Sequence, residues 1–221
     1  MTLRVAIASE YDGYDGEIYR FLLEAILCTP VTKWTGAFVF NGCNSVAKSA
    51  PGFLLAAQRA GVRHALLAVD NDGGAMRRPE HEDQHVVPTF NIKDTTSCRA
   101  CWLTAAVPAA WSGSGGLSCV VVPVQVIETW LLSIRGHSFS ASTAERTYDR
   151  RALKRHFFGP GAFPPTRVAI AHAMTELQKP HALATLRTRP SFQRLEAALA
   201  AWLAPPASRP AAPAASPPAG P

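Results

Sequence analysis

The chain has 221 residues, of which 48% are hydrophobic and 17% are charged, and its formal net charge at pH 7 is +6. This length suffices for one sizeable core, and so high a hydrophobic share excludes a wholly disordered chain. No apolar run approaches the length that crosses a bilayer, so we expect no membrane partner. The basic surplus favours a polyanionic partner, nucleic acid before a membrane surface. The alternative is simply a basic globular protein.

The N-terminal residues and the cysteines bear on the compartment. Residues 1–8 enter an apolar strand at once and lack the longer apolar region and cleavage site of a signal peptide, so we expect a cytoplasmic protein. The chain has five cysteines, an odd number, which in the reducing cytoplasm favours free thiols or a metal site over a disulfide framework. Cys28, Cys43 and Cys119 lie in apolar settings and are predicted to be buried and inert.

The first third of the chain alternates strand and helix patterns. Strands are predicted at 4–9, 33–40 and 64–69, and helices at 17–27 and 45–60. Asp15 is expected to cap the first helix, and Pro51 to interrupt the second. Short connections between these elements predict a parallel βαβαβ unit, and therefore an α/β fold.

The remainder is predicted to add one strand and several helices. A polar loop is expected at 73–88, a Ser/Gly loop at 111–116, a fourth strand at 119–124, and helices at 97–107, 126–134, 141–158, 168–178 and 191–203. Residues 204–221 are Pro- and Ala-rich and predict a disordered tail. We therefore expect three parts: an α/β domain over 1–135 with an insert at about 75–107, a helical part over 136–203 packed on it, and the tail.

Acidic residues follow two of the predicted strands. Glu10 ends the first strand, and Asp70 and Asp72 follow the third, two positions apart and therefore pointing the same way in an extended chain. Parallel strands end at one edge of the sheet, where α/β proteins bind ligands. The pattern predicts a hard-oxygen site for Mg²⁺ or Mn²⁺. The alternative is an ordinary strand-to-turn exit, since Gly73 and Gly74 come next.

This arrangement resembles the Toprim domain, in which a Glu follows the first strand and an Asp-x-Asp pair the third, as in topoisomerases, primases and OLD-type nucleases. It is most similar to small stand-alone Toprim-like proteins of bacterial and phage-defence loci. Those carry a further acid in a Pro…Glu-x-Trp segment, matched here by Pro123 to Trp130 with Glu128, and a closing Ser-Phe helix, matched by 190–196. The resemblance covers roughly residues 3 to 203. One departure is the loop from Glu10 to Gly13, where the family has Glu followed directly by Gly.

The resemblance implies a Rossmann-like, mostly parallel sheet flanked by helices, and a metal-dependent nuclease or related phosphoryl-transfer enzyme. It implies that Asp70 and Asp72 hold Mg²⁺ or Mn²⁺, that Glu10 completes the site or acts as general acid or base, and that Glu128 ligates a second metal. The alternative for Glu128 is a partly exposed helix acid. Two candidates for the acid at the start of the first helix are Asp15 and Glu17, each of which also suits an N-terminal cap.

Cysteine and histidine pairs occur between the third and fourth predicted strands. The spacings of His81-x3-His85 and Cys98-x2-Cys101 are those of a Cys₂His₂ zinc site with the pairs in reversed order. A structural Zn²⁺ would stabilise the segment between the third predicted strand and Pro108, which has few residues that could form a core. The alternatives are a solvated loop followed by a buried cysteine pair, and a redox Cys-x-x-Cys.

Basic residues recur at helical spacing in the segment 141–158. They predict a face that contacts the phosphate backbone of DNA or RNA, with Lys154 or Arg150 offsetting charge on the reacting phosphorus. The alternative is a solvated helix surface. No base-reading motif is visible, so strong sequence specificity is not expected. The face consists of Arg146, Arg150, Arg151, Lys154 and Arg155.

Two rival functions belong to other classes. One is a non-catalytic, zinc-stapled Toprim-like binding or sensor module that works with a partner ATPase. The other is a Rossmann-type nucleotide-binding enzyme, against which the missing Gly-x-Gly-x-x-Gly after the first strand counts. The setting implied by the resemblance is phage defence or DNA or RNA processing, and the sequence leaves self-association open.

Overall fold

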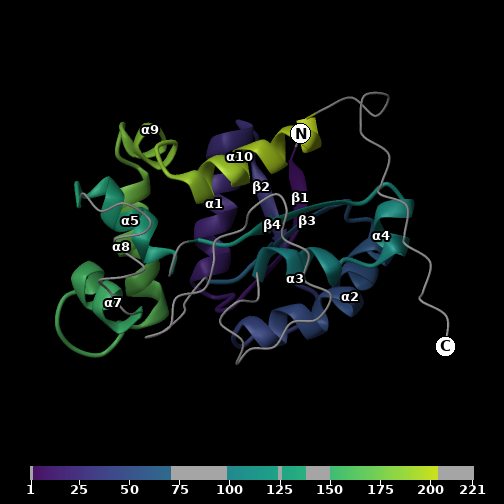
Figure 1. Ribbon diagram of the computed structural model, residues 1–221, viewed down its shortest axis with the longest axis horizontal. Coiled ribbons are helices and arrows are strands. Elements are labelled where there is room, and N and C mark those ends of the chain that lie inside the picture. Colours follow the sequence, from purple (N-terminus) through teal and green to yellow (C-terminus); the bar gives the residue numbers. More distant parts are fainter. Residues whose placement is uncertain (1, 71–98, 124–125, 138–149, 204–221) are drawn as a thin grey trace.

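A computed structural model describes residues 2–70, 99–123, 126–137 and 150–203. Its centre is a four-stranded parallel sheet in the order β2-β1-β3-β4 (Figure 1). The strands are β1 (Leu3–Ser9), β2 (Val31–Trp34), β3 (His64–Ala68) and β4 (Leu117–Val121). The prediction of an α/β fold with a parallel sheet is confirmed, and the architecture is Rossmann-like.

The two faces of the sheet enter different apolar clusters. Val5 and Ile7 of β1 point into one cluster, whereas Ala6 and Ala8 point into the other. This alternation follows from the two-residue period of a strand. All four side chains are fully buried, which explains why the strands are continuous apolar runs in the sequence.

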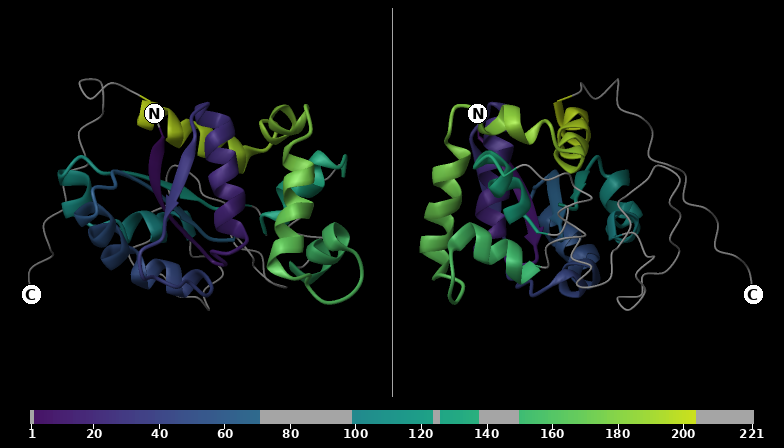
Figure 2. Two further views of the ribbon diagram at one scale, coloured as in Figure 1. Left: turned by 180° about the vertical axis from the view of Figure 1, so that it is seen from behind. Right: turned by 60° about the vertical axis from the view of Figure 1, so that its left-hand side comes forward.

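Helices cover both faces (Figures 1 and 2). The helices α1 (Asp15–Leu27) and α10 (Pro190–Leu203) pack on the face that holds Val5 and Ile7. The opposite face is covered by α2 (Cys43–Arg59), α3 (Arg99–Ala105) and α4 (Ala109–Gly113). The first-third prediction of strand, helix, strand, helix, strand is therefore confirmed.

Further helices gather beyond one end of the sheet (Figures 1 and 2). They are α5 (Glu128–Ile134), α7 (Arg150–Phe158), α8 (Thr166–Leu177) and α9 (Ala182–Leu186), and α5 packs against the other three. The buried indole N–H of Trp130 on α5 donates to the hydroxyl of Ser191 at 2.9 Å. The ring of Trp130 also meets Phe192 edge to face at 5.2 Å. The two segments quoted for the Toprim resemblance thus contact each other.

Several predicted boundaries were wrong. The strand expected at 33–40 is β2, which ends at Trp34, because Gly36 takes a left-handed φ of 58° and turns the chain. The fourth strand begins and ends earlier than expected, at Leu117 and Val121. Pro51 does not interrupt α2, because Ala50, Phe53 and Leu54 around it are fully buried and hold the helix together.

The structure also corrects the predictions for the stretch 111–116 and for one cysteine. The stretch 111–116 is not a Ser/Gly loop throughout, since α4 extends to Gly113 and its Trp111 is fully buried. Burial of that indole outweighs the loop-forming composition around it. Cys43 and Cys119 are buried as predicted, and burial raises the pKa of the Cys119 thiol to about 12. Cys28, in contrast, is exposed, because it follows α1 as a left-handed C-cap residue beyond the last buried side chain.

Among the described residues, no helix is both long and apolar enough to cross a membrane.

Candidate functional site

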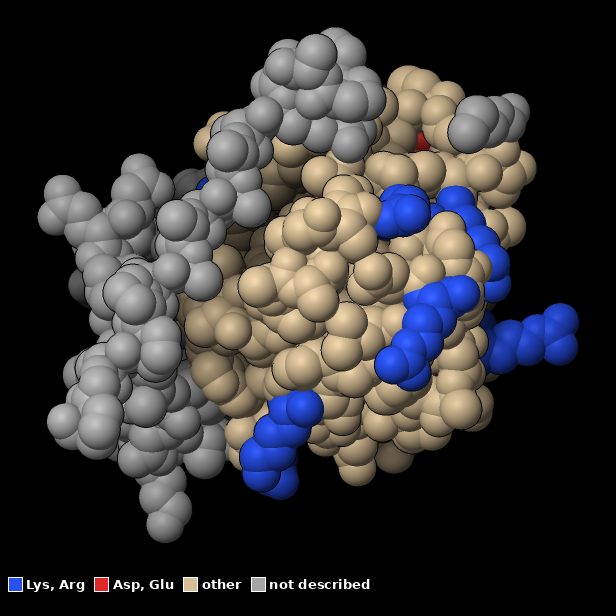
Figure 3. All heavy atoms as spheres, turned by 90° about the vertical axis from the view of Figure 1, so that its right-hand side faces the viewer, with Lys and Arg blue, Asp and Glu red and all other residues tan. Residues whose placement is uncertain are grey.

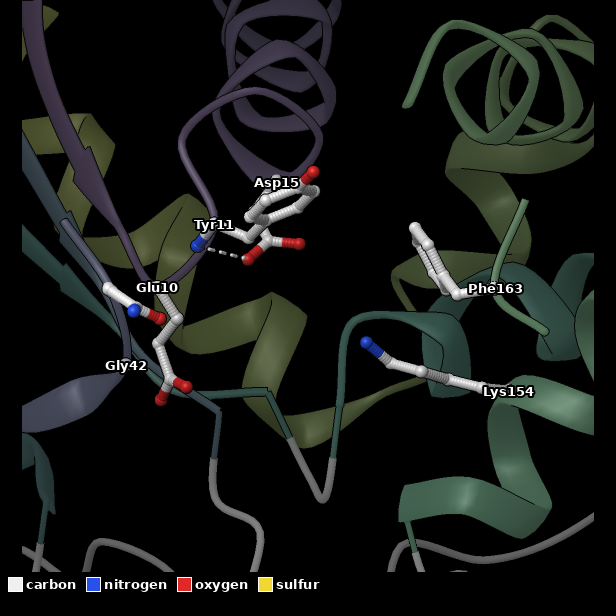
Figure 4. A pocket seen from close by; sticks show the side chains of 7 residues that line it. Glu10, Tyr11, Asp15, Gly42, Lys154 and Phe163 are labelled. Atoms are coloured by element: carbon white, nitrogen blue, oxygen red, sulfur yellow. Dashed lines mark hydrogen bonds between the residues drawn. The ribbon is translucent and has the colours of Figure 1, made fainter. Parts of the chain in front are cut away.

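A pocket lies where the carboxyl end of β1 faces α7 (Figure 4). Its volume is about 210 Å³, which is smaller than the sites that enclose drug-sized ligands. Lys154 projects into it from the right, Glu10 lines its left wall with the carboxylate turned downward, and Asp15, Tyr11 and Phe163 form its upper part in this view. The full lining is Glu10, Tyr11, Asp15, Asn41, Gly42, Lys154 and Phe163.

Glu10 and Asp70 meet at the end of the sheet. Glu10 Oε1 accepts the backbone N–H of Asp70 at 3.0 Å, across 60 residues of sequence. Both side chains are buried. The predicted convergence of these strand ends is therefore present, and parallel pairing of β1 with β3 produces it.

A buried arginine holds this junction together. Arg99, at the start of α3, is 4% exposed, and its guanidinium lies 3.8 Å from Glu10 Oε1. The same group donates a hydrogen bond to the carbonyl of Asp70. A buried carboxylate requires a counter-charge of this kind, because desolvation penalises it strongly. Arg99 is thus a cation of the site that the sequence did not reveal.

Asp15 supplies a third carboxylate, from the first turn of α1. It is buried and accepts the backbone N–H of Tyr11 at 3.1 Å, so it closes the loop after β1. It does not cap the helix, whose N-cap residue is Tyr14, and that prediction was wrong. Burial and then repulsion from Glu128 raise the pKa of Asp15 to about 7, against the opposing effect of Lys154.

Glu128 supplies a fourth carboxylate, from the first turn of α5. It is 1% exposed, so the alternative of a partly exposed helix acid was wrong. Its Oε1 lies 3.7 Å from Lys154 Nζ on α7. Lys154 in turn lies over the ring of Phe163, 4.9 Å from its centroid. The ammonium group of Lys154 therefore lies between the carboxylate of Glu128 and the ring of Phe163.

The pKa values of two buried tyrosines are raised by burial and by the carboxylates near them. Burial, followed by repulsion from Glu128, Asp15 and Asp70, raises the pKa of Tyr14. The pKa of Tyr19 is raised by burial and by the same carboxylates, among which Asp70 acts most strongly. We use the term acidic cluster for Glu10, Asp15, Asp70 and Glu128.

The donor chemistry of the acidic cluster fits a hard divalent cation. Burial and then repulsion from Glu128 raise the pKa of Asp15, and a bound cation would relieve that repulsion. Within the ranges that the structure describes, however, no group of three or more His, Cys, Asp or Glu side chains is arranged to hold a metal ion. Asp72, the second acid of the predicted pair, lies outside those ranges.

Glu17 is not part of the acidic cluster. It pairs with Arg20 at 2.9 Å and with Lys33 at 3.1 Å, on the outer side of α1. These contacts lower the pKa of Glu17 despite its partial burial. Of the two candidates at the start of the first helix, the structure therefore places Asp15 near Glu10 and Glu128.

The predicted zinc ligands are mostly beyond the described ranges. His81, His85 and Cys98 lie outside them, and Cys101 lies on α3 with an intermediate exposure. The zinc site stays a prediction.

The basic helix is present as α7 in the part of its range that is described. Arg151 and Arg155 are exposed, as a phosphate-contacting face requires, whereas Lys154 turns inward to the pocket. The side chain of Arg150 and the whole of Arg146 lie outside the described part.

Positive charge is not confined to α7. Figure 3 shows Lys and Arg side chains spread over the end of the molecule that bears α2 and α4, with very little acidic surface among them. Arg4 and Arg63, near the amino ends of β1 and β3, donate to the carbonyls of Ala60 and Ser114. Net charge alone therefore does not locate a nucleic-acid surface.

Residues that the sequence did not single out complete the pocket. Gly42 has a φ of 79° and its N–H donates to the carbonyl of Glu10 at 3.1 Å, which ties the loop before α2 to the end of β1. Tyr11 and Phe163 line the pocket from segments 152 residues apart, and no sequence pattern connects them. The Asn41-Gly42 turn signal was visible, but its approach to Glu10 was not.

Comparisons with protein-family models, with curated proteins and with solved structures gave no match to this chain.

Proposed function

We propose that the chain is a metal-dependent phosphodiesterase, a nuclease or related phosphoryl-transfer enzyme of the Toprim-like kind, that acts on DNA or RNA. The observation that carries the proposal is the junction of the buried Glu10 and Asp70 at the carboxyl edge of a parallel sheet, with the buried Asp15 and Glu128 near enough to repel each other and Lys154 3.7 Å from Glu128. Buried acids that repel one another destabilise a fold, so such a cluster is typical of a functional site.

Each residue of the cluster has a proposed role. Asp70, with Asp72, and Glu128 would hold Mg²⁺ or Mn²⁺, which when bound supplies Lewis acidity to the phosphodiester. Asp15 has a pKa of about 7, so near neutral pH it could accept or donate the proton of an attacking or leaving oxygen. Lys154 would stabilise negative charge on the phosphate.

The role of Glu10 differs from the one that the resemblance implies. Its carboxylate is engaged by the Asp70 N–H and lies beside Arg99. In this arrangement Glu10 positions the backbone that carries Asp70. We propose that it acts as a positioning residue through Oε1, and that any bond from Glu10 to a metal ion would come from Oε2.

The same contacts favour a second candidate, a non-catalytic binding or sensor module that works with a partner ATPase. In such a module the contacts of Glu10 with the Asp70 N–H and with Arg99 would serve to hold the fold together. In that case the acidic cluster would bind no catalytic ion.

One experiment separates the two candidates. The full chain is incubated with plasmid, single-stranded DNA and RNA in Mg²⁺, Mn²⁺ or EDTA, beside an Asp70→Asn variant. Cleavage that requires the metal and is lost in the variant supports the enzyme. Absence of turnover on every substrate, from a chain that remains folded, supports the module.

A further inference from the structure

Two aromatic side chains stand at the pocket with much of their surface in solvent. Tyr11 is 48% exposed and Phe163 is 39% exposed, although both belong to residue types that normally bury their rings. Both line the same pocket as Glu10 and Lys154 (Figure 4). Isolated exposed apolar residues need no explanation, but a pair beside a charged pocket does.

The two rings are held in place. Their centroids are 6.4 Å apart in an edge-to-face arrangement. The Tyr11 hydroxyl bonds to Thr166 Oγ1 at 2.8 Å, and Phe163 also packs edge to face on the buried ring of Tyr14 at 5.6 Å. A ligand that stacks on them would therefore lose little entropy in ordering them.

Charge on the pocket walls defines the ligand further. Lys154 Nζ lies 4.9 Å from the centre of the Phe163 ring and 3.7 Å from Glu128. Glu10 and Asp15 also line the pocket, so an anionic group can lie only on the side of Lys154. The Phe163 ring next to this ammonium group therefore suits a ligand that has a flat aromatic part and an anionic part. A nucleotide has both, and the cavity of about 210 Å³ is too small for a longer segment of nucleic acid.

We infer that the perpendicular rings of Tyr11 and Phe163 form a site for an unpaired nucleobase, which stacks on one ring and meets the other with its edge, so that the substrate is a single-stranded segment or end. The inference rests on the proposed function, whose substrate it narrows. In a duplex the base faces are covered by their neighbours, and only an unstacked base can meet these rings. The neighbouring phosphate would then lie near Lys154.

A purely structural role predicts something different. The Tyr11 contacts also join the loop after β1 to the start of α8, so the rings could serve only to connect these segments. Conservative and non-conservative variants separate the two roles. Phe163→Tyr and Tyr11→Phe keep the ring, whereas Phe163→Leu and Tyr11→Leu keep only an apolar side chain.

The test measures binding in EDTA, so that it is independent of cleavage. Fluorescence anisotropy is recorded for the full chain with a labelled sixteen-nucleotide single strand that has no self-complementary sequence, and with the fully paired duplex that it forms with its complement. The single strand is expected to bind at least tenfold more tightly. The Leu variant of the ring on which the base stacks should weaken single-strand binding about 5- to 100-fold, as expected for loss of one stacked base, and the other Leu variant should weaken it less. Tyr11→Phe, Phe163→Tyr and the control Val39→Ala, at an 85% exposed residue outside the pocket lining, should stay within twofold.

Equal affinity for duplex and single strand, or Leu variants that bind like the parent while their thermal unfolding is unchanged, would overturn the inference. Metal-dependent cleavage of duplex by the same protein would then leave the proposed function standing. Single-strand binding that depends on the rings, without cleavage of any substrate, would support the stacking site and contradict the enzyme.

Discussion

The carboxylate of Glu10 and the backbone N–H of Asp70 form a 3.0 Å hydrogen bond that joins the ends of β1 and β3. This bond places two acidic residues from distant parts of the sequence at one edge of the sheet. Arg99 stabilises the pair from the start of α3, through Glu10 and the Asp70 carbonyl. Both the stability and the proposed chemistry of the site therefore depend on this junction and on the acidic cluster around it.

Loss of Arg99 should destabilise the fold. Arg99→Met keeps much of the side-chain volume but leaves Glu10 without its buried cation, which costs about 3–5 kcal/mol in systems of this kind. Urea unfolding of the two proteins at pH 7 measures the difference. Arg63→Met removes an exposed guanidinium that bonds a loop carbonyl, and it should cost less than about 1 kcal/mol. Equal losses in the two variants would show that Arg99 is not compensating a buried charge.

The stability of the metal-free protein should fall as pH rises. The pKa of Asp15 is raised from 3.8 to about 7 in the folded chain, so between these values the folded state binds more protons than the unfolded state. At about 1.4 kcal/mol per pKa unit, the loss between pH 4 and pH 8 reaches at most about 4 kcal/mol from this residue. Urea unfolding of the wild type and of Asp15→Asn in EDTA at several pH values measures this loss. The free energy of unfolding of the variant should change less with pH.

Glu17 provides a control for that measurement, because its effect on stability should change with pH in the opposite direction. Its pKa is lowered, because hydrogen bonds from Arg20 and Lys33 outweigh its partial burial. Its contribution is therefore present above its unfolded pKa and is lost on acidification. Glu17→Gln should lose stability at pH 7 and little at pH 3. If the stability change caused by Asp15→Asn varied with pH in the same direction as that caused by Glu17→Gln, the raised pKa of Asp15 would be refuted.

Removal of the Ser191 hydroxyl should destabilise the contact between α5 and α10. In Ser191→Ala the buried N–H of Trp130 loses its acceptor, which costs about 1–3 kcal/mol. Thr188→Ala, which removes an exposed hydroxyl that donates to a carbonyl at 2.7 Å, should stay within about 0.5 kcal/mol of wild type. Thermal unfolding of both variants measures the contrast, and a neutral Ser191→Ala would mean that water replaces the hydroxyl.

Charge removal on α7 should weaken nucleic-acid binding without sequence preference. Arg151 and Arg155 are exposed, so replacing either by Gln should lower the slope of log affinity against log salt by about 1 for each phosphate that the variant no longer neutralises. Filter binding at several salt concentrations tests this prediction. An unchanged slope in both variants would assign nucleic-acid binding to another basic face, such as the one in Figure 3.

Much of the fold followed from local patterns, because buried parallel strands are apolar runs that end in turn residues. The proximity of Glu10 and Asp70 followed from topology alone, since parallel neighbours end at one edge. The burial of Glu128 and its contact with Lys154 did not follow from periodicity, because both depend on the packing of α5 against α7.

Other features were beyond sequence reasoning because tertiary contacts decide them. Arg99 looks like any helical arginine until the fold places it beside Glu10, and Tyr11 meets Phe163 only through the packing of α8 on α1. The helix around Trp111 forms because the indole is buried, against a local Ser and Gly composition that favours a loop.

The proposed enzyme depends most on whether the acidic cluster binds a divalent ion. Titration of the full chain with Mn²⁺, followed by electron paramagnetic resonance, measures bound and free ion directly. Saturable Mn²⁺ binding that Mg²⁺ displaces, and that Asp70→Asn and Glu128→Gln abolish while Glu17→Gln preserves it, is the predicted result. Mn²⁺ binding that is absent, or that is equally strong in all four proteins, would contradict it.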